Sequence, residues 1–151
     1  MSQGHLALRR GRRSLAHHVY HVTTATKARE PFFRTSNAAH AAARCFTESP
    51  LLGDCRLLAW VLMPDHVHWL MQLGAKDSLE MVVSRLKSSS ARKANAVLGR
   101  TGALWEKAYH DRAMRSNDDL ARVASYIIAN PIRAGLVEDI GHYPYWNSGW
   151  I

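Results

Sequence analysis

Several common features are missing from this sequence, and each absence excludes a class of protein. Its 151 residues include only two cysteines, Cys45 and Cys55, which excludes a disulfide scaffold and a four-cysteine zinc site. The most apolar run, at residues 57–63, is far shorter than the ~20 residues that a membrane-spanning helix needs. The arginines near the start are not followed by an apolar segment, so we expect no secretory signal. The sequence therefore predicts a cytoplasmic protein with reduced thiols and no membrane partner.

Motifs of nucleotide hydrolysis and of serine or cysteine catalysis are also missing. Gly99 and Gly102 do not form a phosphate-binding loop, and neither a G-x-S-x-G motif nor a catalytic-cysteine context occurs. Apolar residues make up 47% of the chain and charged residues 21%, which excludes a disordered or low-complexity protein. The length fits one domain with its own hydrophobic core.

Acidic residues are scarce relative to basic ones. Twelve Asp and Glu stand against twenty Lys and Arg, which gives a formal charge of +8 and an isoelectric point near 10.0. Most of the basic residues are arginines, whose planar guanidinium group binds two phosphate oxygens at once. A small basic domain of this kind typically binds nucleic acid. The alternative is that the arginines only keep the surface soluble.

The chain divides into a basic N-terminal arm at residues 1–15, a domain at 16–140 and an aromatic tail at 141–151. The arm contains Arg9, Arg10, Arg12 and Arg13. The tail contains Tyr143, Tyr145, Trp146 and Trp150. Exposed aromatic rings can stack on single-stranded bases, but we expect these rings to hold the tail against the core.

Local patterns predict a mixed fold. Apolar and β-branched runs predict strands at 17–26, 56–63 and 66–73, and a further strand at the end of 104–115. Capping signals predict helices at 36–48, 78–98 and 119–129, the last stopped by the proline at position 131. This order predicts an α+β fold of the ferredoxin-like, split βαβ type, which is an antiparallel sheet with helices packed against it.

Two histidines are the first candidate site. His66 and His68 lie two residues apart on a predicted strand, so their side chains point to the same face, with Cα atoms ~6.7 Å apart. Two imidazoles at this spacing can bind one divalent metal, and Asp65 beside them can orient a ligand. The alternative is a pair of half-buried histidines in a sheet.

The second candidate site lies on the helix at 119–129. Arg122, Tyr126 and Asn130 recur at every fourth position, so they form a polar stripe beside the buried one. An activated phenol can attack phosphorus, and an amide oxygen can bind a hard metal. From spacing alone, an ordinary amphipathic tyrosine and a helix-terminal asparagine explain the stripe better.

Basic residues on the helix at 78–98 are candidate phosphate contacts. They are Arg85, Lys87, Arg92 and Lys93, with serines between them. A solvated helix face explains them equally well.

Taken together, these residues resemble the single-tyrosine HUH transposases, and within them the REP-associated tyrosine transposases of bacteria. The similar segments are YHVTTAT (20–26), REPFF (29–33), WVLMPDHVHWLMQ (60–72), LWEKAYHDRAMR (104–115) and YIIANPIRAGLV (126–137). The occurrence of MPDHVH and YIIANPIRAGLV in this order makes the resemblance specific.

The resemblance implies a function and a role for each candidate residue. His66 and His68 would bind Mg²⁺ or Mn²⁺, and Tyr126 would be the nucleophile. The third ligand would be the polar residue one turn later, which is Asn130 here where relatives have glutamine. The implied reaction is cleavage and transfer of single-stranded DNA at REP-type hairpins through a 5′-phosphotyrosine.

The implied partner is therefore hairpin DNA, held in part by the basic arm, by the basic residues of the long helix and by Arg122. A nucleoid-associated protein is expected. Both a monomer and a homodimer fit, because related enzymes place the tyrosine either in cis or in trans.

Other functions and other nucleophiles remain open. The chain can be a non-catalytic, sequence-specific DNA-binding module derived from such a transposase, or a structural or metal-storage protein of the same fold. Tyr109 and Tyr20 are rival nucleophiles, and Tyr109 is flanked by His110 and Asp111.

Overall fold

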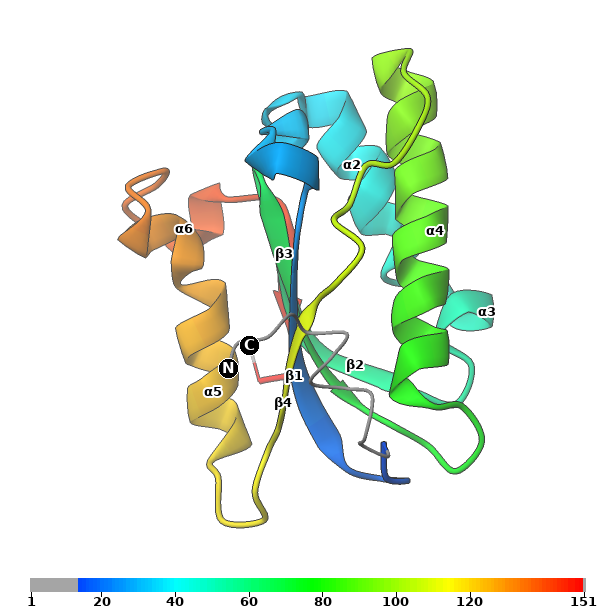
Figure 1. Ribbon diagram of the computed structural model, residues 1–151. Coiled ribbons are helices and arrows are strands. Elements are labelled where there is room, and N and C mark those ends of the chain that lie inside the picture. Colours follow the sequence, from blue (N-terminus) through cyan, green and yellow to red (C-terminus); the bar gives the residue numbers. More distant parts are fainter. Residues whose placement is uncertain (1–13, 151) are drawn as a thin grey trace.

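The computed structural model describes residues 14–150 (Figure 1). The predicted DNA contacts of the basic arm, Arg9, Arg10, Arg12 and Arg13, lie outside the described residues. Within residues 14–150, no helix is long and apolar enough to cross a membrane.

In the described part of the chain, five strands form one antiparallel sheet in the order β4-β1-β3-β2-β5. The strands are β1 (Val19–Ala25), β2 (Arg56–Met63), β3 (His66–Gln72), β4 (His110–Ala113) and β5 (Trp146–Ser148). A turn at Pro64 and Asp65 joins β2 to β3, and β3 lies between β1 and β2. This is the ferredoxin-like arrangement of a split βαβ unit, so the predicted α+β fold is confirmed.

Helices cover both faces of the sheet. They are α2 (Ser36–Cys45), α3 (Ser49–Leu52), α4 (Leu79–Leu98), α5 (Leu120–Ile128) and α6 (Asn130–Arg133), with 3₁₀ turns η1 (Lys27–Arg29), η2 (Phe32–Arg34) and η3 (Ile140–His142). The first three helices lie on one side of the sheet, and α5 and α6 lie on the other (Figure 1). We call the second side the α5 face.

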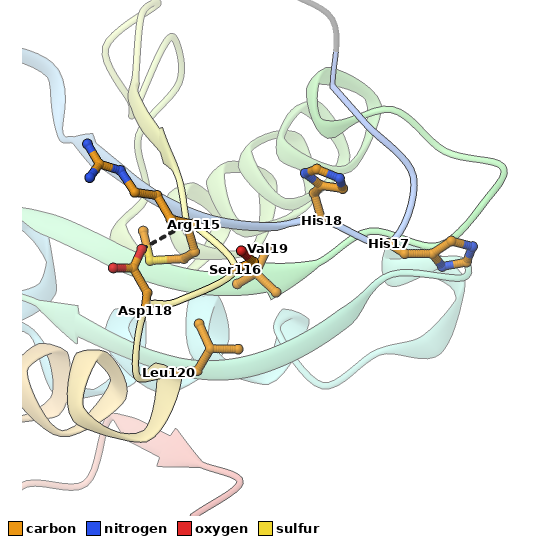
Figure 2. Close-up of a pocket in the computed structure, with 8 residues that line it drawn as sticks. His17, His18, Val19, Arg115, Ser116, Asp118 and Leu120 are labelled. Carbon is orange, nitrogen blue, oxygen red and sulfur yellow. Dashed lines mark hydrogen bonds between the residues drawn. The ribbon is translucent and has the colours of Figure 1, made fainter.

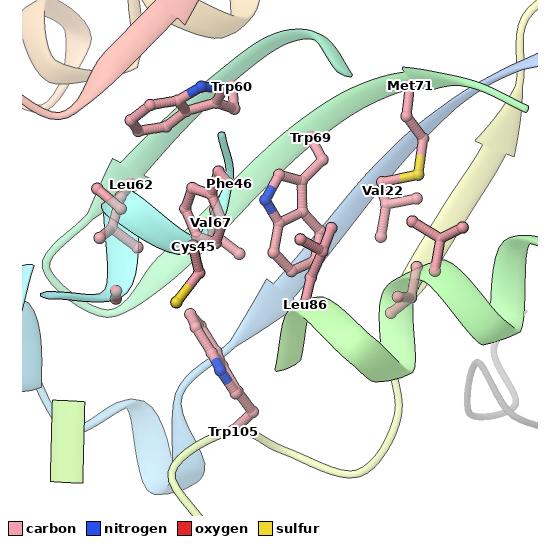
Figure 3. Packing of buried hydrophobic residues seen from close by; sticks show 14 of the residues in the cluster. Val22, Cys45, Phe46, Trp60, Leu62, Val67, Trp69, Met71, Leu86 and Trp105 are labelled. Carbon is pink, nitrogen blue, oxygen red and sulfur yellow. The ribbon is translucent and has the colours of Figure 1, made fainter. Parts of the chain in front are cut away.

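Alternation along the strands produces two hydrophobic cores. On β3, Val67, Trp69 and Met71 point toward α2 and α4, whereas Leu70 points toward α5. Trp69 is fully buried, and its ring centroid lies 5.4 Å from that of Phe46 (Figure 3). A side chain that points away from the Trp69 core therefore belongs to the α5 face.

Capping explains where the longer helices begin and end. The Ser78 hydroxyl accepts a hydrogen bond from the Met81 amide at 3.2 Å, and α4 ends at Gly99, which adopts a left-handed φ of 66°. The Asp119 carboxylate caps α5 in the same way. α5 ends at Ile128, as Pro131 predicts, but the chain then begins α6, with Pro131 in its first turn where no amide hydrogen is needed.

The aromatic tail lies against β2. The Tyr143 hydroxyl donates to the Leu62 carbonyl at 2.6 Å, and the Trp146 indole donates to the Ile140 carbonyl at 3.1 Å. The expected attachment of the tail thus appears in the structure. Its short strand β5, paired with β2, was not predicted.

Candidate active site

His66 and His68 are neighbours on the α5 face of β3. Their ring centroids lie 5.0 Å apart in an edge-to-face arrangement. The side chain between them, Val67, is fully buried in the opposite core. Strand alternation therefore brings the two imidazoles together, as the His-x-His spacing predicts.

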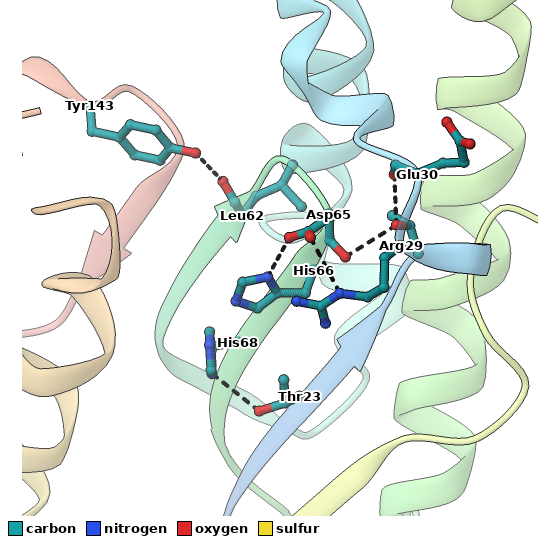
Figure 4. A network of polar contacts seen from close by, with 9 residues as sticks. Thr23, Arg29, Glu30, Leu62, Asp65, His66, His68 and Tyr143 are labelled. Atoms are coloured by element: carbon teal, nitrogen blue, oxygen red, sulfur yellow. Dashed lines mark hydrogen bonds and ion pairs between the residues drawn. The ribbon is translucent and has the colours of Figure 1, made fainter. Parts of the chain in front are cut away.

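Each imidazole is held through its Nδ1 atom. The Nδ1–H of His66 donates to the Asp65 carboxylate at 2.8 Å, and Arg29 pairs with the other oxygen of Asp65 at 3.3 Å (Figure 4). The Nδ1 atom of His68 lies 2.9 Å from Nε2 of His21 and 3.1 Å from the Thr23 hydroxyl. Within residues 14–150 no hydrogen bond is recorded at either Nε2 atom, so these are the two nitrogens that could bind a metal.

His21 is a functional candidate that the sequence analysis missed. It lies on β1, and β1 pairs with β3 so that both His21 and His68 point to the α5 face. The pairing register of β1 with β3 would have been the signal, since it sets Thr23 opposite His68. Local patterns do not supply that register.

Burial keeps these imidazoles neutral. It is the main cause that lowers the pKa of His68 from 6.5 to about 3, with the charges of His21, His66 and Arg133 acting in the same direction. Burial also lowers the pKa of His21 to about 4, helped by the charge of Arg112. Both rings carry free lone pairs at neutral pH, which is the form that binds a metal.

Tyr126 projects from α5 and is 64% exposed. It lines a cavity of about 400 Å³ together with His21, Arg112 and Arg122 from three different elements, and the walls are completed by Val123 and Ile127. His21 thus borders the cavity of Tyr126 on one side and contacts His68 on the other. The phenol and the imidazoles share one face of the sheet.

Asn130 lies at the start of α6, and its amide nitrogen donates to the Ile127 carbonyl at 2.8 Å. This bond leaves the amide oxygen as the acceptor that a metal would need. Within residues 14–150, no group of three or more His, Cys, Asp or Glu side chains is arranged to hold a metal. The donor set for a divalent ion is therefore two imidazoles, with oxygen ligands needed to complete the shell.

The rival tyrosines point into the other core. Tyr20 is 3% exposed and Tyr109 is 7% exposed, and both pack with the α2 and α4 side of the sheet. Neither ring is on the face that carries His66 and His68. The geometry therefore favours Tyr126 among the three.

The basic residues of α4 lie on the opposite side of the sheet from the histidines. Three of them have protein partners: Arg85 pairs with Asp77, Lys93 with Glu48, and Lys87 donates to two backbone carbonyls. Only Arg122 of the helical candidates borders the Tyr126 cavity. DNA contacts by the α4 residues stay a prediction.

A second cavity, of about 250 Å³, neighbours the Tyr126 cavity, since its lining residue Val19 is two residues from His21 on β1. It is lined by His17, His18, Val19, Met114, Arg115, Ser116, Asp118 and Leu120 (Figure 2). Val19 pairs with Gln72, whereas Ala25 at the other end of β1 pairs with His66. Six residues of strand therefore separate this cavity from His66 by ~20 Å.

Comparison with known proteins finds relatives among the REP-associated tyrosine transposases. A Haemophilus influenzae protein assigned to the REP-associated tyrosine transposases is 30% identical over 98 residues, which are 58% of this chain and 56% of that protein. A REP-associated tyrosine transposase of Escherichia coli is 26% identical over 89 residues, which are 58% of this chain and 50% of that protein. The chain spans about half the length of these curated relatives.

The fold is also that of a solved relative. The structure of a REP-associated tyrosine transposase bound to a REP hairpin superposes with a TM-score of 0.70 at 19% identity, covering 97% of this chain and 82% of the other. Residues 14–130 match the family described as "Transposase IS200 like". Because this match covers most of the chain, the protein belongs to the IS200-like transposase family.

Proposed function

We propose that this protein is a metal-dependent endonuclease and strand transferase that acts on single-stranded DNA at the foot of REP-type hairpins. The observation that carries the proposal is the shared α5 face, where Tyr126 and His21 border one cavity and His21 contacts His68. The relatives and the hairpin-bound structural neighbour support hairpin DNA as the substrate.

The reaction is a transfer of the phosphoryl group to Tyr126. Its hydroxyl loses a proton to solvent, which reaches this exposed side chain, and the oxygen attacks the phosphorus of the scissile phosphodiester. The bond from phosphorus to the 3′ oxygen breaks, and that oxygen takes a proton from water. The products are a 5′-phosphotyrosine and a free 3′-hydroxyl, and a later attack by a 3′-hydroxyl reverses the same exchange.

His66 and His68 would hold Mg²⁺ or Mn²⁺ through their Nε2 atoms, and Asn130 would offer an amide oxygen. When bound, the ion would act as a Lewis acid on the scissile phosphate. Asp65 orients His66, and His21 with Thr23 orients His68, so the protein fixes which ring nitrogen is available.

The test is cleavage of a panel of hairpins from the host genome, each labelled at the 5′ end or the 3′ end. The proposal expects the 3′ label to migrate with the protein on a denaturing gel, while the 5′-labelled fragment is released. Tyr126→Phe should form no adduct, and Tyr109→Phe, the matched control, should form it normally. EDTA should stop the reaction, and added Mn²⁺ should restore it.

An adduct that persists in Tyr126→Phe, or cleavage that continues in EDTA, would contradict the proposal. A non-catalytic DNA-binding module is the second candidate, and it is favoured by the lack of a third His or acidic ligand within residues 14–150. If the protein is such a module, it should bind the hairpin but form no covalent adduct with it in the presence of either Mg²⁺ or Mn²⁺.

A further inference from the structure

Arg133 lies directly on the candidate nucleophile. Its guanidinium carbon is 3.8 Å from the centroid of the Tyr126 ring. The chain turns at Ala129 between α5 and α6, and Arg133 is the last residue of α6. Neither side chain is buried. The contact thus joins two exposed side chains, of which Tyr126 lines the cavity of the candidate site.

The charge of Arg133 has no acidic partner within residues 14–150. The ion pairs recorded there involve other residues, and the same holds for Arg112 and Arg122 beside Tyr126. The charge of Arg133 also acts on His68. Arg133 therefore stands within electrostatic reach of both the phenol and His68. An unpaired cation in this place favours an anionic ligand.

Stacking uses only the face of a guanidinium group. The N–H donors radiate in its plane, so a guanidinium that stacks on a ring keeps its edge free for phosphate oxygens. A lysine ammonium has no such edge and no bidentate geometry. The position and the residue type together suit a phosphate that lies next to the Tyr126 hydroxyl.

We propose that Arg133 is a catalytic residue that holds a non-bridging oxygen of the scissile phosphate while its planar face positions the Tyr126 ring for attack. This inference rests on the proposed function and adds a protein group to it. Binding of the developing charge by a fixed donor lowers the barrier of phosphoryl transfer, since the charge on those oxygens changes during the reaction.

The experiment measures the single-turnover rate of adduct formation on a cleavable hairpin, together with hairpin affinity. Arg133→Ala should slow the rate by ~100-fold or more, while hairpin affinity changes only a few-fold. Arg133→Lys should recover only part of the rate. Added guanidinium ion at millimolar concentration should accelerate Arg133→Ala, because it restores the missing donor, and should leave the wild type unchanged.

Arg44→Ala is the matched control, because Arg44 is an exposed arginine on α2, on the far side of the sheet. It should react like the wild type. Thermal unfolding of every variant separates lost chemistry from lost folding.

Each result decides the proposal. A slow Arg133→Ala rescued by guanidinium supports it. A rate within about 3-fold of the wild type overturns it, and so does a slow variant that guanidinium does not rescue, which points to a structural role. Both of these results leave the proposed function intact if the wild type forms the adduct. A wild type that forms no adduct removes the proposed function, and this inference with it.

Discussion

The Nε2 atom of His21 lies 2.9 Å from the Nδ1 atom of His68, so an imidazole of β1 holds an imidazole of β3 across the sheet. Metal binding through Nε2 of His68 requires the hydrogen on Nδ1. His21 then serves as the acceptor of that hydrogen, beside the Thr23 hydroxyl. The contact therefore accommodates the tautomer that a metal-binding His68 would need.

Replacement of this acceptor should weaken the metal site. We expect His21→Phe to lower the affinity for Mn²⁺ by ~10-fold or more, because outer contacts of ligating histidines typically have effects of this size. His21→Gln retains an acceptor oxygen and should lose less. A titration of Mn²⁺ followed by electron paramagnetic resonance measures both, and equal affinity in all three proteins would contradict the role given to His21.

The stability of the metal-free protein should fall in mild acid. His21 and His68 have folded-state pKa values of about 4 and about 3, below the ordinary 6.5. The unfolded chain therefore binds more protons between these values and pH 6.5, and acid favours it. The contribution of the two neutral imidazoles to the free energy of unfolding is fully present above pH 6.5 and is lost progressively as the pH falls toward 3.

The expected loss between pH 7 and pH 5 is up to about 2 kcal/mol for an imidazole that stays neutral in the fold. Urea unfolding at the two pH values measures it. His21→Phe should show a smaller pH effect than the wild type, with His142→Phe, at an exposed position, as the control. If His21→Phe retains the full pH effect, burial of the two imidazoles is not its source.

Tyr126 should contribute little to stability. Because its side chain is 64% exposed, Tyr126→Ala should cost less than ~1 kcal/mol of unfolding free energy, most of it from the lost contact with Arg133. Tyr109→Ala should cost ~3 kcal/mol or more, because that ring is buried in the core. Urea unfolding of the two variants compares them directly, and equal losses would place Tyr126 in the packed structure instead.

Variants of Lys87 and Arg92 should distinguish a basic residue that stabilises the fold from one that contacts DNA. Lys87 donates to the carbonyls of Glu106 and Lys107 at 2.7 and 3.0 Å, and burial lowers its pKa. Lys87→Met should therefore reduce stability by ~1 kcal/mol.

Arg92 is exposed, so Arg92→Ala should leave stability within ~0.5 kcal/mol of the wild type. If α4 contacts hairpin phosphates, this variant binds hairpin more weakly and with a salt dependence smaller by about one unit of slope. Fluorescence anisotropy at several salt concentrations measures both quantities. An unchanged slope would remove Arg92 from the DNA surface.

Local patterns were sufficient for the main elements. The apolar runs around Pro64 and Asp65 predicted both strands of the central hairpin, since an apolar run and a turn are properties of adjacent residues. The same is true of α4, whose ends follow from Ser78 and Gly99. β5 was missed because a strand of three residues gains its stability from pairing with β2 and has no pattern of its own.

The candidate site likewise combines features that the sequence predicts with features that only the structure shows. The sequence alone determined that His66 and His68 share a face, because both lie on β3, and that Tyr126 lies on a helix. The structure places Asn130 on the next helix, α6, beyond the chain turn at Ala129. Only the tertiary structure decided that His21 holds His68, that Arg133 covers Tyr126, and that α4 places its basic residues on the other side of the sheet. Those relationships depend on strand register, a chain turn and the side on which a helix crosses, and no local periodicity encodes contacts between distant parts of the chain.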